Sequence, residues 1–254
     1  MAWDSKQYLK FANERKQPCI DLLSRLNGNF NSILDLGCGP GNSTKNLYNK
    51  FSSATIVGFD ADKNMLKKAE ADYPEFTFIQ GYAPYDFDKL TSKFDLVFSN
   101  ACIHWIPDQQ SLINAVYELL NDGGVFAVQI PITKESPFYK LLDNLICSKW
   151  TKLCDVHNFH SLSVAEYYNI LIEKFKKIEI WSSNYYHITD SAEMVIEWYK
   201  GSGLRPYLSQ FDESEQTEFL DDLRKAVTAE YEVLNDGKLF LIMPRLFFIA
   251  EKLD

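Results

Sequence analysis

The stretch "ILDLGCGPGNST", Ile33–Thr44, places an apolar, strand-like run directly before three glycines at alternate positions, Gly37, Gly39 and Gly41. The apolar run contains one acid, Asp35. Glycine lacks a Cβ atom, so a loop built from it can adopt positive φ angles and lets a ligand approach the main chain closely. A strand that ends in such a loop and continues as a helix predicts a ligand site at the carboxyl edge of an open α/β sheet.

The spacing of these glycines argues against a dinucleotide site. The dinucleotide fingerprint is G-x-G-x-x-G, and its third glycine falls on Asn42 in this chain. The pattern present is G-x-G-x-G, preceded by Asp35. The sequence therefore disfavours a nicotinamide oxidoreductase. Measured binding of NAD would support that function again.

Short apolar runs alternate with segments of helical periodicity through the first half of the chain. The predicted strands cover 32–37, 55–61, 76–81, 94–101 and 124–131, and the predicted helices cover 43–51, 62–73 and 108–124. Asp108 is expected to cap the last of these helices, and residues 121–124 are expected to stop it. This alternation predicts an α/β fold with a doubly wound, mostly parallel sheet and helices on both faces.

The second half of the chain predicts two more strands, at 176–188 and 238–253, which complete a sheet of seven. A helix is expected over 138–150, since the preceding Ser136 and Pro137 suit a helix start. The whole chain, 1–254, is predicted to be a single domain.

Two further helices are expected between those strands. Asp190 with Glu193 and Asp212 with Glu215 each have the spacing of a reciprocal cap at a helix start. We expect residues 190–236 to form a helical lid, inserted before the last strand, over a cofactor-binding core that spans 30–131.

Composition narrows the choice of ligand. The formal net charge of −9 argues against nucleic acid or an anionic membrane as a partner. The five cysteines are an odd number without C-x-x-C spacing, so neither a disulfide framework nor a zinc knuckle is expected. The N-terminal segment has no signal-peptide core, and no run approaches a membrane span. We expect a cytoplasmic protein that acts on a small molecule as a monomer.

The glycine loop and its neighbours resemble the class I S-adenosylmethionine-dependent methyltransferases. That family has an acid before G-x-G-x-G on the first strand, an acid that meets ribose hydroxyls after the second, and residues near the methionine part of the cofactor after the fourth. Their counterparts here are Asp35, Asp60 in "TIVGFDAD" and the segment "FSNACIHW". The alternative is that the two acids are only a helix cap and a turn residue.

The resemblance implies S-adenosylmethionine as the cofactor. The residues it places against that cofactor are Arg15, Asp35, Gly37, Gly39, Asn42, Asp60, Ala61, Met65, Tyr82, Asn100 and Trp105. Tyr82 departs from the family, which commonly has an acid there for the adenine amino group, so main-chain groups or aromatic packing are expected to recognise the base. Met65 also suits a core position, and Arg15 also suits a solvated helix face.

A narrower resemblance covers nearly the whole chain. It is to the trans-aconitate methyltransferase family, and it rests on the ordered set "WDSKQYLKFANERKQP", "GNST", "HWIPD", "WSSNYYH", "GSGLRPYL" and "PRLFFIA". That family forms a methyl ester on a small tricarboxylic acid. His104 departs from the pattern, which often has Gln before this Trp, and this leaves room for a different acceptor.

The chemistry of the residues agrees with an acidic acceptor. A carboxylate with a pKa near 4 is already a nucleophile at neutral pH, so neither a catalytic base nor a metal is required. Arginine is the side chain that best holds a carboxylate, because its planar fork donates to both oxygens. Arg205 lies in "GSGLRPYL" and Arg245 in the apolar strand "LFLIMPRLFFIA". A buried guanidinium requires an anion, which is either the substrate or a structural acid.

Aromatic and histidine side chains complete the predicted acceptor pocket. Its predicted residues are Tyr8, Trp105, Tyr186, His187, Arg205 and Arg245. Tyr186 and His187 lie on opposite faces of their strand, so both cannot line one site equally. His157 and His160 have a spacing that suits metal, but no acid or cysteine accompanies them, and no metal site is expected.

Two alternatives keep the cofactor and change the function. One is a carboxyl methyltransferase for a fatty or isoprenoid acid, which would not depend on Arg205 and Arg245. The other is a protein that binds S-adenosylmethionine without chemistry, which would give no methylated product with any acceptor.

Overall fold

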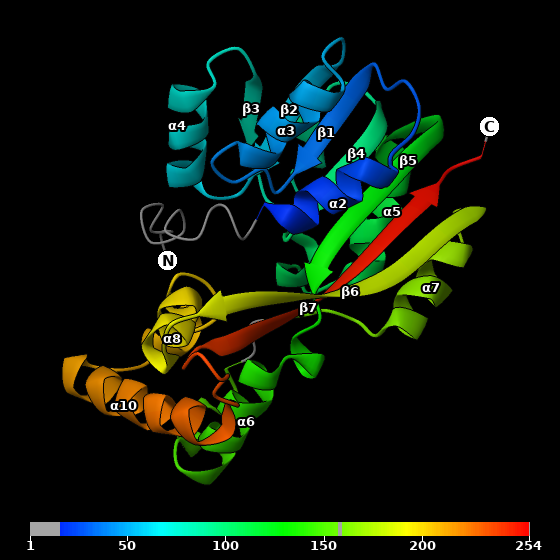
Figure 1. The fold of residues 1–254 in the computed structure, drawn as a ribbon. Coiled ribbons are helices and arrows are strands. Elements are labelled where there is room, and N and C mark those ends of the chain that lie inside the picture. The colour runs from blue at the N-terminus through cyan, green and yellow to red at the C-terminus, as the bar shows by residue number, and fades with distance from the viewer. Residues whose placement is uncertain (1–15, 157–158, 254) are drawn as a thin grey trace.

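The structure is a computed structural model that describes residues 16–156 and 159–253 of the chain. The strands are β1 (Ser32–Leu36), β2 (Thr55–Asp60), β3 (Thr77–Gln80), β4 (Phe94–Asn100), β5 (Leu120–Pro131), β6 (Lys177–Thr189) and β7 (Leu239–Glu251). They form one seven-stranded sheet in the order β3-β2-β1-β4-β5-β7-β6 (Figure 1). β1 to β5 are parallel, and β7 runs antiparallel to both of its neighbours. The predicted fold class is confirmed.

Helices cover both faces of the sheet. The α-helices of the described residues are α2 (Gln17–Arg25), α3 (Asn42–Lys50), α4 (Lys63–Asp72), α5 (Gln109–Leu119), α6 (Pro137–Ser148), α7 (Val164–Ile172), α8 (Ala192–Lys200), α9 (Arg205–Leu208) and α10 (Glu213–Glu230). Leu22 of α2 and Leu47 of α3 are buried against one face beside Phe247 of β7. Val116 of α5 and Tyr167 of α7 are buried on the other face. Each such side chain contributes roughly 1.5–3 kcal/mol through burial.

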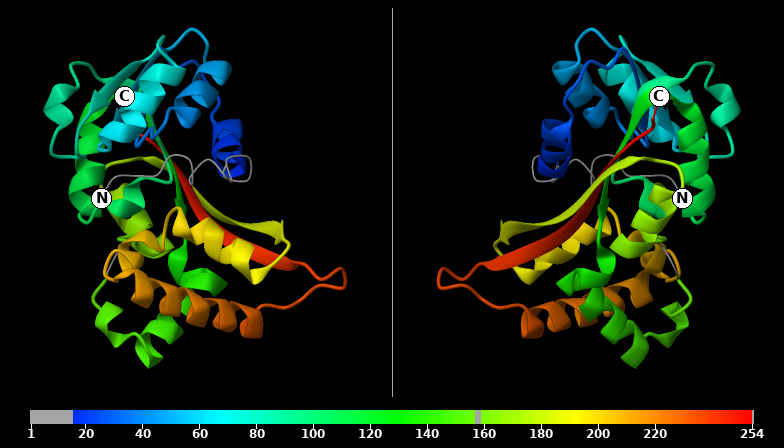
Figure 2. Two further views of the ribbon diagram at one scale, coloured as in Figure 1. Left: turned by 90° about the vertical axis from the view of Figure 1, so that its left-hand side faces the viewer. Right: turned by 90° about the vertical axis from the view of Figure 1, so that its right-hand side faces the viewer.

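β6 and β7 extend beyond the other strands, and α6, α8 and α10 gather around their far ends (Figures 1 and 2). Phe138 of α6, Ile196 of α8 and Leu223 of α10 share a buried cluster with Leu241 of β7. The chain between α8 and α10 turns back from this helical layer toward the carboxyl edge of the parallel strands, where Arg205 and its neighbours reach the site described below.

The predicted helix caps are partly right. Asp212 and Glu215 form the expected reciprocal cap of α10, and the Asp108 side chain accepts a hydrogen bond from the Ser111 amide at the start of α5 (2.9 Å). The predicted pair of Asp190 and Glu193 is wrong, because α8 begins one residue later. Its cap is Ser191, whose hydroxyl oxygen accepts the Met194 amide.

The predicted end of α5 is also wrong. β5 begins at Leu120, so residues 121–124 lie in the strand instead of ending a helix. Leu120 pairs with Phe94 of β4, and a register shift follows in the next residues. The buried Lys252 donates from Nζ to the carbonyl oxygens of Tyr117 and Leu120, at 3.2 and 3.0 Å. Strand pairing and this lysine end the helix before the glycines do.

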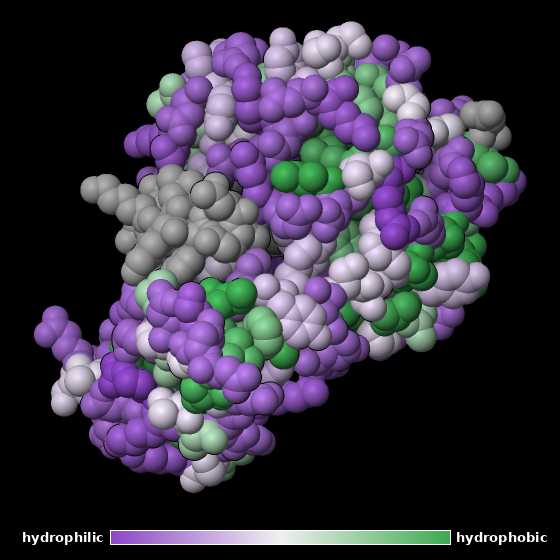
Figure 3. Space-filling model, viewed as in Figure 1, coloured by the Kyte–Doolittle hydropathy of each residue, from purple (hydrophilic) through white to green (hydrophobic). Residues whose placement is uncertain are grey.

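Hydrophilic residues cover most of the face seen in Figure 3, and apolar residues form separate patches on it. None of the described helices combines the length and apolar character needed to cross a membrane.

Candidate functional site

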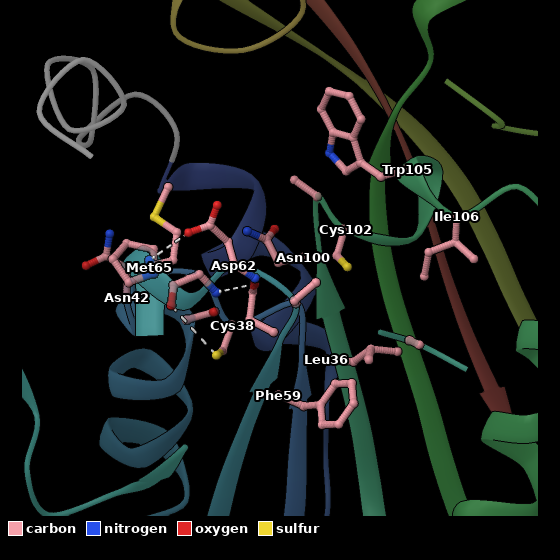
Figure 4. A pocket seen from close by; sticks show the side chains of 18 of the residues that line it. Leu36, Cys38, Asn42, Phe59, Asp62, Met65, Asn100, Cys102, Trp105 and Ile106 are labelled. Carbon is pink, nitrogen blue, oxygen red and sulfur yellow. Dashed lines mark hydrogen bonds between the residues drawn. The ribbon is translucent and has the colours of Figure 1, made fainter. Parts of the chain in front are cut away.

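A cavity of about 590 Å³ lies at the carboxyl ends of β1, β2 and β4 (Figure 4). Asn42, Asp62 and Met65 lie on one side of it, and Trp105 and Ile106 lie on the other. The structure brings these predicted residues to its wall: Gly37, Gly39, Asn42, Asp60, Ala61, Met65, Tyr82, Asn100, Trp105 and Arg205. The motifs that follow separate strands therefore meet in one place.

The glycine loop brings main chain to the cavity wall. Gly37 has a φ of 77°, and a Cβ atom there would lie 2.2 Å from Cβ of Cys102. Gly39 has a φ of 54°, and a Cβ atom there would have no atom of the described residues within 4 Å. Since Gly39 lines the cavity, that space is part of the cavity and is open to a ligand. A glycine is required at position 37 because the loop packs closely on Cys102, and at position 39 because a side chain there would enter the cavity.

Asp60 is held at the end of β2 by the main chain. Its Oδ2 accepts the Gly39 amide at 2.9 Å, and its Oδ1 accepts the Asp62 amide at 2.8 Å. Burial raises the pKa of Asp60, while these amide bonds act in the opposite direction. Each carboxylate oxygen has lone pairs left, and the two hydroxyls of a ribose are donors of suitable spacing. This corner of the cavity fits a nucleoside.

Asp35 lies behind the loop and is not among the residues that line the cavity. The side chain is completely buried, and its Oδ2 accepts hydrogen bonds from the hydroxyls of Ser43 (2.8 Å) and Thr44 (2.6 Å). Burial raises the pKa of Asp35 to about 6, against the effect of these two hydrogen bonds. The predicted acid of the motif thus ties the end of β1 to the first turn of α3.

Apolar and aromatic side chains form other parts of the cavity wall. Met65 is buried and lines the wall, as expected for either of its predicted roles. Tyr82 also lines the cavity but is 64% exposed, so it lies at the rim. The Trp105 ring packs at a tilt against those of His104 and Phe159, at centroid distances of 5.0 and 4.8 Å. The indole is therefore a fixed wall of the site.

A second, smaller cavity of about 110 Å³ adjoins the first. Asn100, Ala101, Trp105 and Ser202 line both of them. The second cavity is also lined by Arg245, which lies on β7 opposite Pro131 of β5. Together the two cavities bring Arg205 and Arg245, predicted from separate segments, to neighbouring walls.

The structure does not bring Tyr186 and His187 to either cavity. Tyr186 is 57% exposed and packs edge-to-face on Phe240. The His187 ring stacks on Trp198, which lines the second cavity, but His187 itself is not among the lining residues. Tyr185 lies on the inner face instead, and its hydroxyl donates to Asp21 of α2 at 2.5 Å. Tyr8 and Arg15 lie outside the described residues.

Several wall residues were not predicted. Cys38, Ser43 and Cys102 line the first cavity, but no sequence pattern distinguishes them from core residues. Gln129 lines the second cavity and had a visible signal, since it is a polar residue inside the apolar strand "GVFAVQIP". A buried polar side chain near the carboxyl end of a strand in this fold marks a site.

Comparison with known proteins agrees with this geometry. Residues 30–193 match the family model described as a methyltransferase domain. The chain is 36% identical to the trans-aconitate 2-methyltransferase of Agrobacterium fabrum, with 99% of this chain and 100% of that protein covered. It is 35% identical to the enzyme of the same name from Escherichia coli O157:H7, with 99% of each chain covered. The chain belongs to this methyltransferase family.

Solved structures of low identity share the fold of this methyltransferase. The YcgJ protein of Bacillus subtilis superposes with a TM-score of 0.61 at 14% identity, covering 94% of this chain and 99% of that one. Phosphoethanolamine N-methyltransferase 2 of Haemonchus contortus, in complex with S-adenosyl-L-methionine, gives 0.54 at 18% identity and covers 98% and 56%. The protein is an S-adenosylmethionine-dependent methyltransferase, and S-adenosylmethionine is its cofactor. The open space at Gly39 and the carboxylate of Asp60 fit the nucleoside part of that molecule.

Proposed function

We propose that this methyltransferase forms a methyl ester on a carboxyl group of trans-aconitate or a closely related small tricarboxylic acid. Two relatives that align over nearly their whole length carry this substrate in their names. The observation in this chain that supports the proposal is the placement of Arg205 and Arg245 on the walls of two joined cavities beside Trp105.

The protein's task in this reaction is to hold the acceptor. S-adenosylmethionine supplies a sulfonium methyl group when bound, and a carboxylate oxygen displaces the sulfur from it. The carboxylate is ionised at neutral pH, so no side chain has to remove a proton. Fixed positioning of the two reactants is worth roughly 7–11 kcal/mol of the barrier. The guanidinium groups orient the acid by donating to both oxygens of a carboxylate.

We place the cofactor in the first cavity, with its ribose at Asp60 and its methionine part toward Asn100 and Trp105. Lys16 lines the same cavity and offers a positive charge for the methionine carboxylate. The acceptor carboxylate that reacts then lies where the two cavities meet. We infer that residues 190–236 serve as the lid, because Ser202 lines both cavities and Arg205 lines the first.

The proposal is tested by transfer of a labelled methyl group from S-adenosylmethionine to a panel of acids. The panel contains trans-aconitate, smaller dicarboxylic acids, a fatty acid and an isoprenoid acid. We expect ester from trans-aconitate, and we expect Arg205→Ala and Arg245→Ala each to lower its kcat/KM by about thirtyfold or more, since loss of a charged partner costs about 2–5 kcal/mol.

Arg224→Ala is the matched control. Arg224 lies on α10, where it pairs with Glu193 and Asp221 away from both cavities, and its removal should leave kcat/KM unchanged. Ester from lipid acids alone, with no effect of Arg205 and Arg245, would show the fatty or isoprenoid alternative to be correct. Cofactor binding without product from any acid would favour the non-catalytic alternative.

We also infer that the enzyme acts in the cytoplasm as a monomer on small molecules and without nucleic acid. All five cysteines are unpaired in the structure, which suits a reducing compartment. The net charge of −9 opposes binding to polyanions.

A further inference from the structure

The second cavity is built from polar side chains that are buried without a hydrogen-bond partner. Within the described residues, Nε2 of Gln129, Nδ1 of His104 and Oδ1 of Asn100 have none. Gln129 is 1% exposed and His104 is 3% exposed. A buried polar group left unsatisfied costs free energy, so the two of these atoms that can donate, Nε2 of Gln129 and Nδ1 of His104, indicate a ligand with acceptor atoms.

Strand pairing places this cluster on one face of the sheet. Asn100 of β4 pairs with Gln129 of β5, and Pro131 of β5 pairs with Arg245 of β7. Paired residues on neighbouring strands project to the same side, and so do residues two apart on one strand. Asn100, Gln129 and Arg245 therefore share the face that α2 covers, and Pro18 of α2 lines the same cavity.

The charge of the cavity identifies the kind of ligand. Arg245 is the charged residue among the described residues that line it, and no Asp or Glu joins them. The His104 imidazole packs against the rings of Trp105 and Phe159, at centroid distances of 5.0 and 5.4 Å. Burial, together with the charge of Arg245, lowers the pKa of His104 to about 3, so the ring is neutral. The other described side chains that line this cavity are uncharged, and a cation in such a lining suits an anion.

The size of the cavity limits how much of a ligand enters it. Its volume of about 110 Å³ is a fraction of the 590 Å³ of the adjoining cavity. A carboxymethyl group is small enough for this space, and the long chain of a fatty acid is not. The shared wall of Asn100, Ala101, Trp105 and Ser202 joins the space to the site of methyl transfer.

We propose that the second cavity is a subsite for a non-reacting carboxylate of the acceptor, in which Gln129 and His104 hydrogen-bond the carboxylate that Arg245 neutralises. This inference rests on the proposed function and adds the residues that select an acid with more than one carboxyl group. A monocarboxylic acid leaves Gln129 and His104 without partners, so it binds more weakly.

Calorimetry on the complex with S-adenosylhomocysteine tests the subsite separately from the reaction. The ligands are trans-aconitate and crotonate, which has a single carboxyl group. The main variant is Gln129→Met, which has similar volume and no hydrogen-bonding group, and His104→Phe is the second variant. The matched control is Gln110→Met, because Gln110 lies on α5 and pairs with Glu173 away from both cavities.

We expect Gln129→Met and His104→Phe to raise the Kd of trans-aconitate by about tenfold or more and to change that of crotonate less than about twofold. We also expect the Tm of the ligand-free Gln129→Met protein to stay level or rise, because the substitution removes an unsatisfied buried group. A purely structural glutamine would give the opposite pattern, with a lower Tm and unchanged affinity.

The inference is overturned if Gln129→Met and His104→Phe both fold and both keep the wild-type Kd for trans-aconitate. It is also overturned if the wild-type complex binds crotonate as tightly as trans-aconitate. Ester formation is scored in a separate assay. Ester with unchanged variant affinities would support the proposed function and reject the subsite, whereas weakened variant binding without any ester would support the subsite and reject the reaction.

Discussion

The two joined cavities are held by different kinds of interaction. The first is a main-chain site, in which the loop of Gly37 and Gly39 and the amides around Asp60 form the wall within a short stretch of each strand end. The second is a side-chain site, assembled from β4, β5, β7, α2 and the helical layer. A cofactor shared by many enzymes is met by backbone geometry, while the acceptor is met by side chains that evolution can exchange without changing the loop.

The largest effect is expected at Gly39. A methyl group added by Gly39→Ala enters the open space of the first cavity, so binding of S-adenosylhomocysteine should fall below detection by calorimetry. The control is Gly237→Ala, because Gly237 has a φ of 82° and equally open surroundings but lies outside both cavities. Equal, unchanged affinities in both variants would show that the cofactor does not use this wall.

A second prediction concerns Asp35, which supports the glycine loop from behind and is not among the residues that line the cavity. The folded protein binds the Asp35 proton more tightly than the unfolded chain does, because burial raises its pKa from 3.8 to about 6. The folded state therefore loses stability as the pH rises from about 4 to about 6, by roughly 3 kcal/mol at full ionisation.

Asp35→Asn has no charge to ionise, so its free energy of unfolding relative to the wild type should rise by that amount across the same pH range. Urea unfolding at pH 4 and pH 7 measures the difference. Asn64→Asp is the control for the effect of one added charge. Asn64 is exposed on α4, so the new carboxyl group is not buried. A difference that stays constant with pH would contradict the buried position of Asp35.

The smallest effect concerns how the acceptor side is held. Tyr185→Phe removes the hydroxyl that donates to Asp21 and so links β6 to α2 above the second cavity. We expect a loss of about 1.5–3 kcal/mol in the free energy of unfolding, typical of a hydrogen bond to a charged group, and a modest rise in KM for the acceptor. Thermal unfolding and steady-state kinetics measure the two effects.

Tyr186→Phe is its matched control. Tyr186 is the neighbouring residue on the outer face of β6, so the same substitution should change neither quantity. An acceptor KM that responds to Tyr186 and not to Tyr185 would restore the sequence-based assignment of Tyr186 to the site.

The difference between the main-chain site and the side-chain site also explains which features of the molecule the sequence predicts. The order of strands and helices, the cap formed by Asp212 and Glu215, and the wall residues from Gly37 to Trp105 follow from local patterns, because parallel strands bring their carboxyl ends to one edge. The position of Asp35 at the end of β1 follows from the motif, but its hydrogen bonds to Ser43 and Thr44 do not, since sequence does not show whether a motif acid faces the ligand or the following helix.

Residues that depend on long-range pairing were less predictable. The alternation of Tyr185 and Tyr186 shows that they face opposite ways, but only the contact with Asp21, far along the chain, decides which face is inner. β6 is an edge strand on which partly buried and exposed residues alternate and none is fully buried, so its inner face is only weakly marked. The polar Gln129 inside an apolar strand marks a site in the sequence, but only the pairing of β5 with β4 and β7 shows that Asn100 and Arg245 lie beside it.

The most direct test of the central claim is a crystal structure of the complex with S-adenosylhomocysteine and trans-aconitate. The account predicts ribose hydroxyls on the Asp60 carboxylate, one acceptor carboxylate beside Trp105 and another within hydrogen-bond distance of Gln129 Nε2 and Arg245. A nucleoside bound away from the glycine loop, or an acid bound outside both cavities, would contradict it.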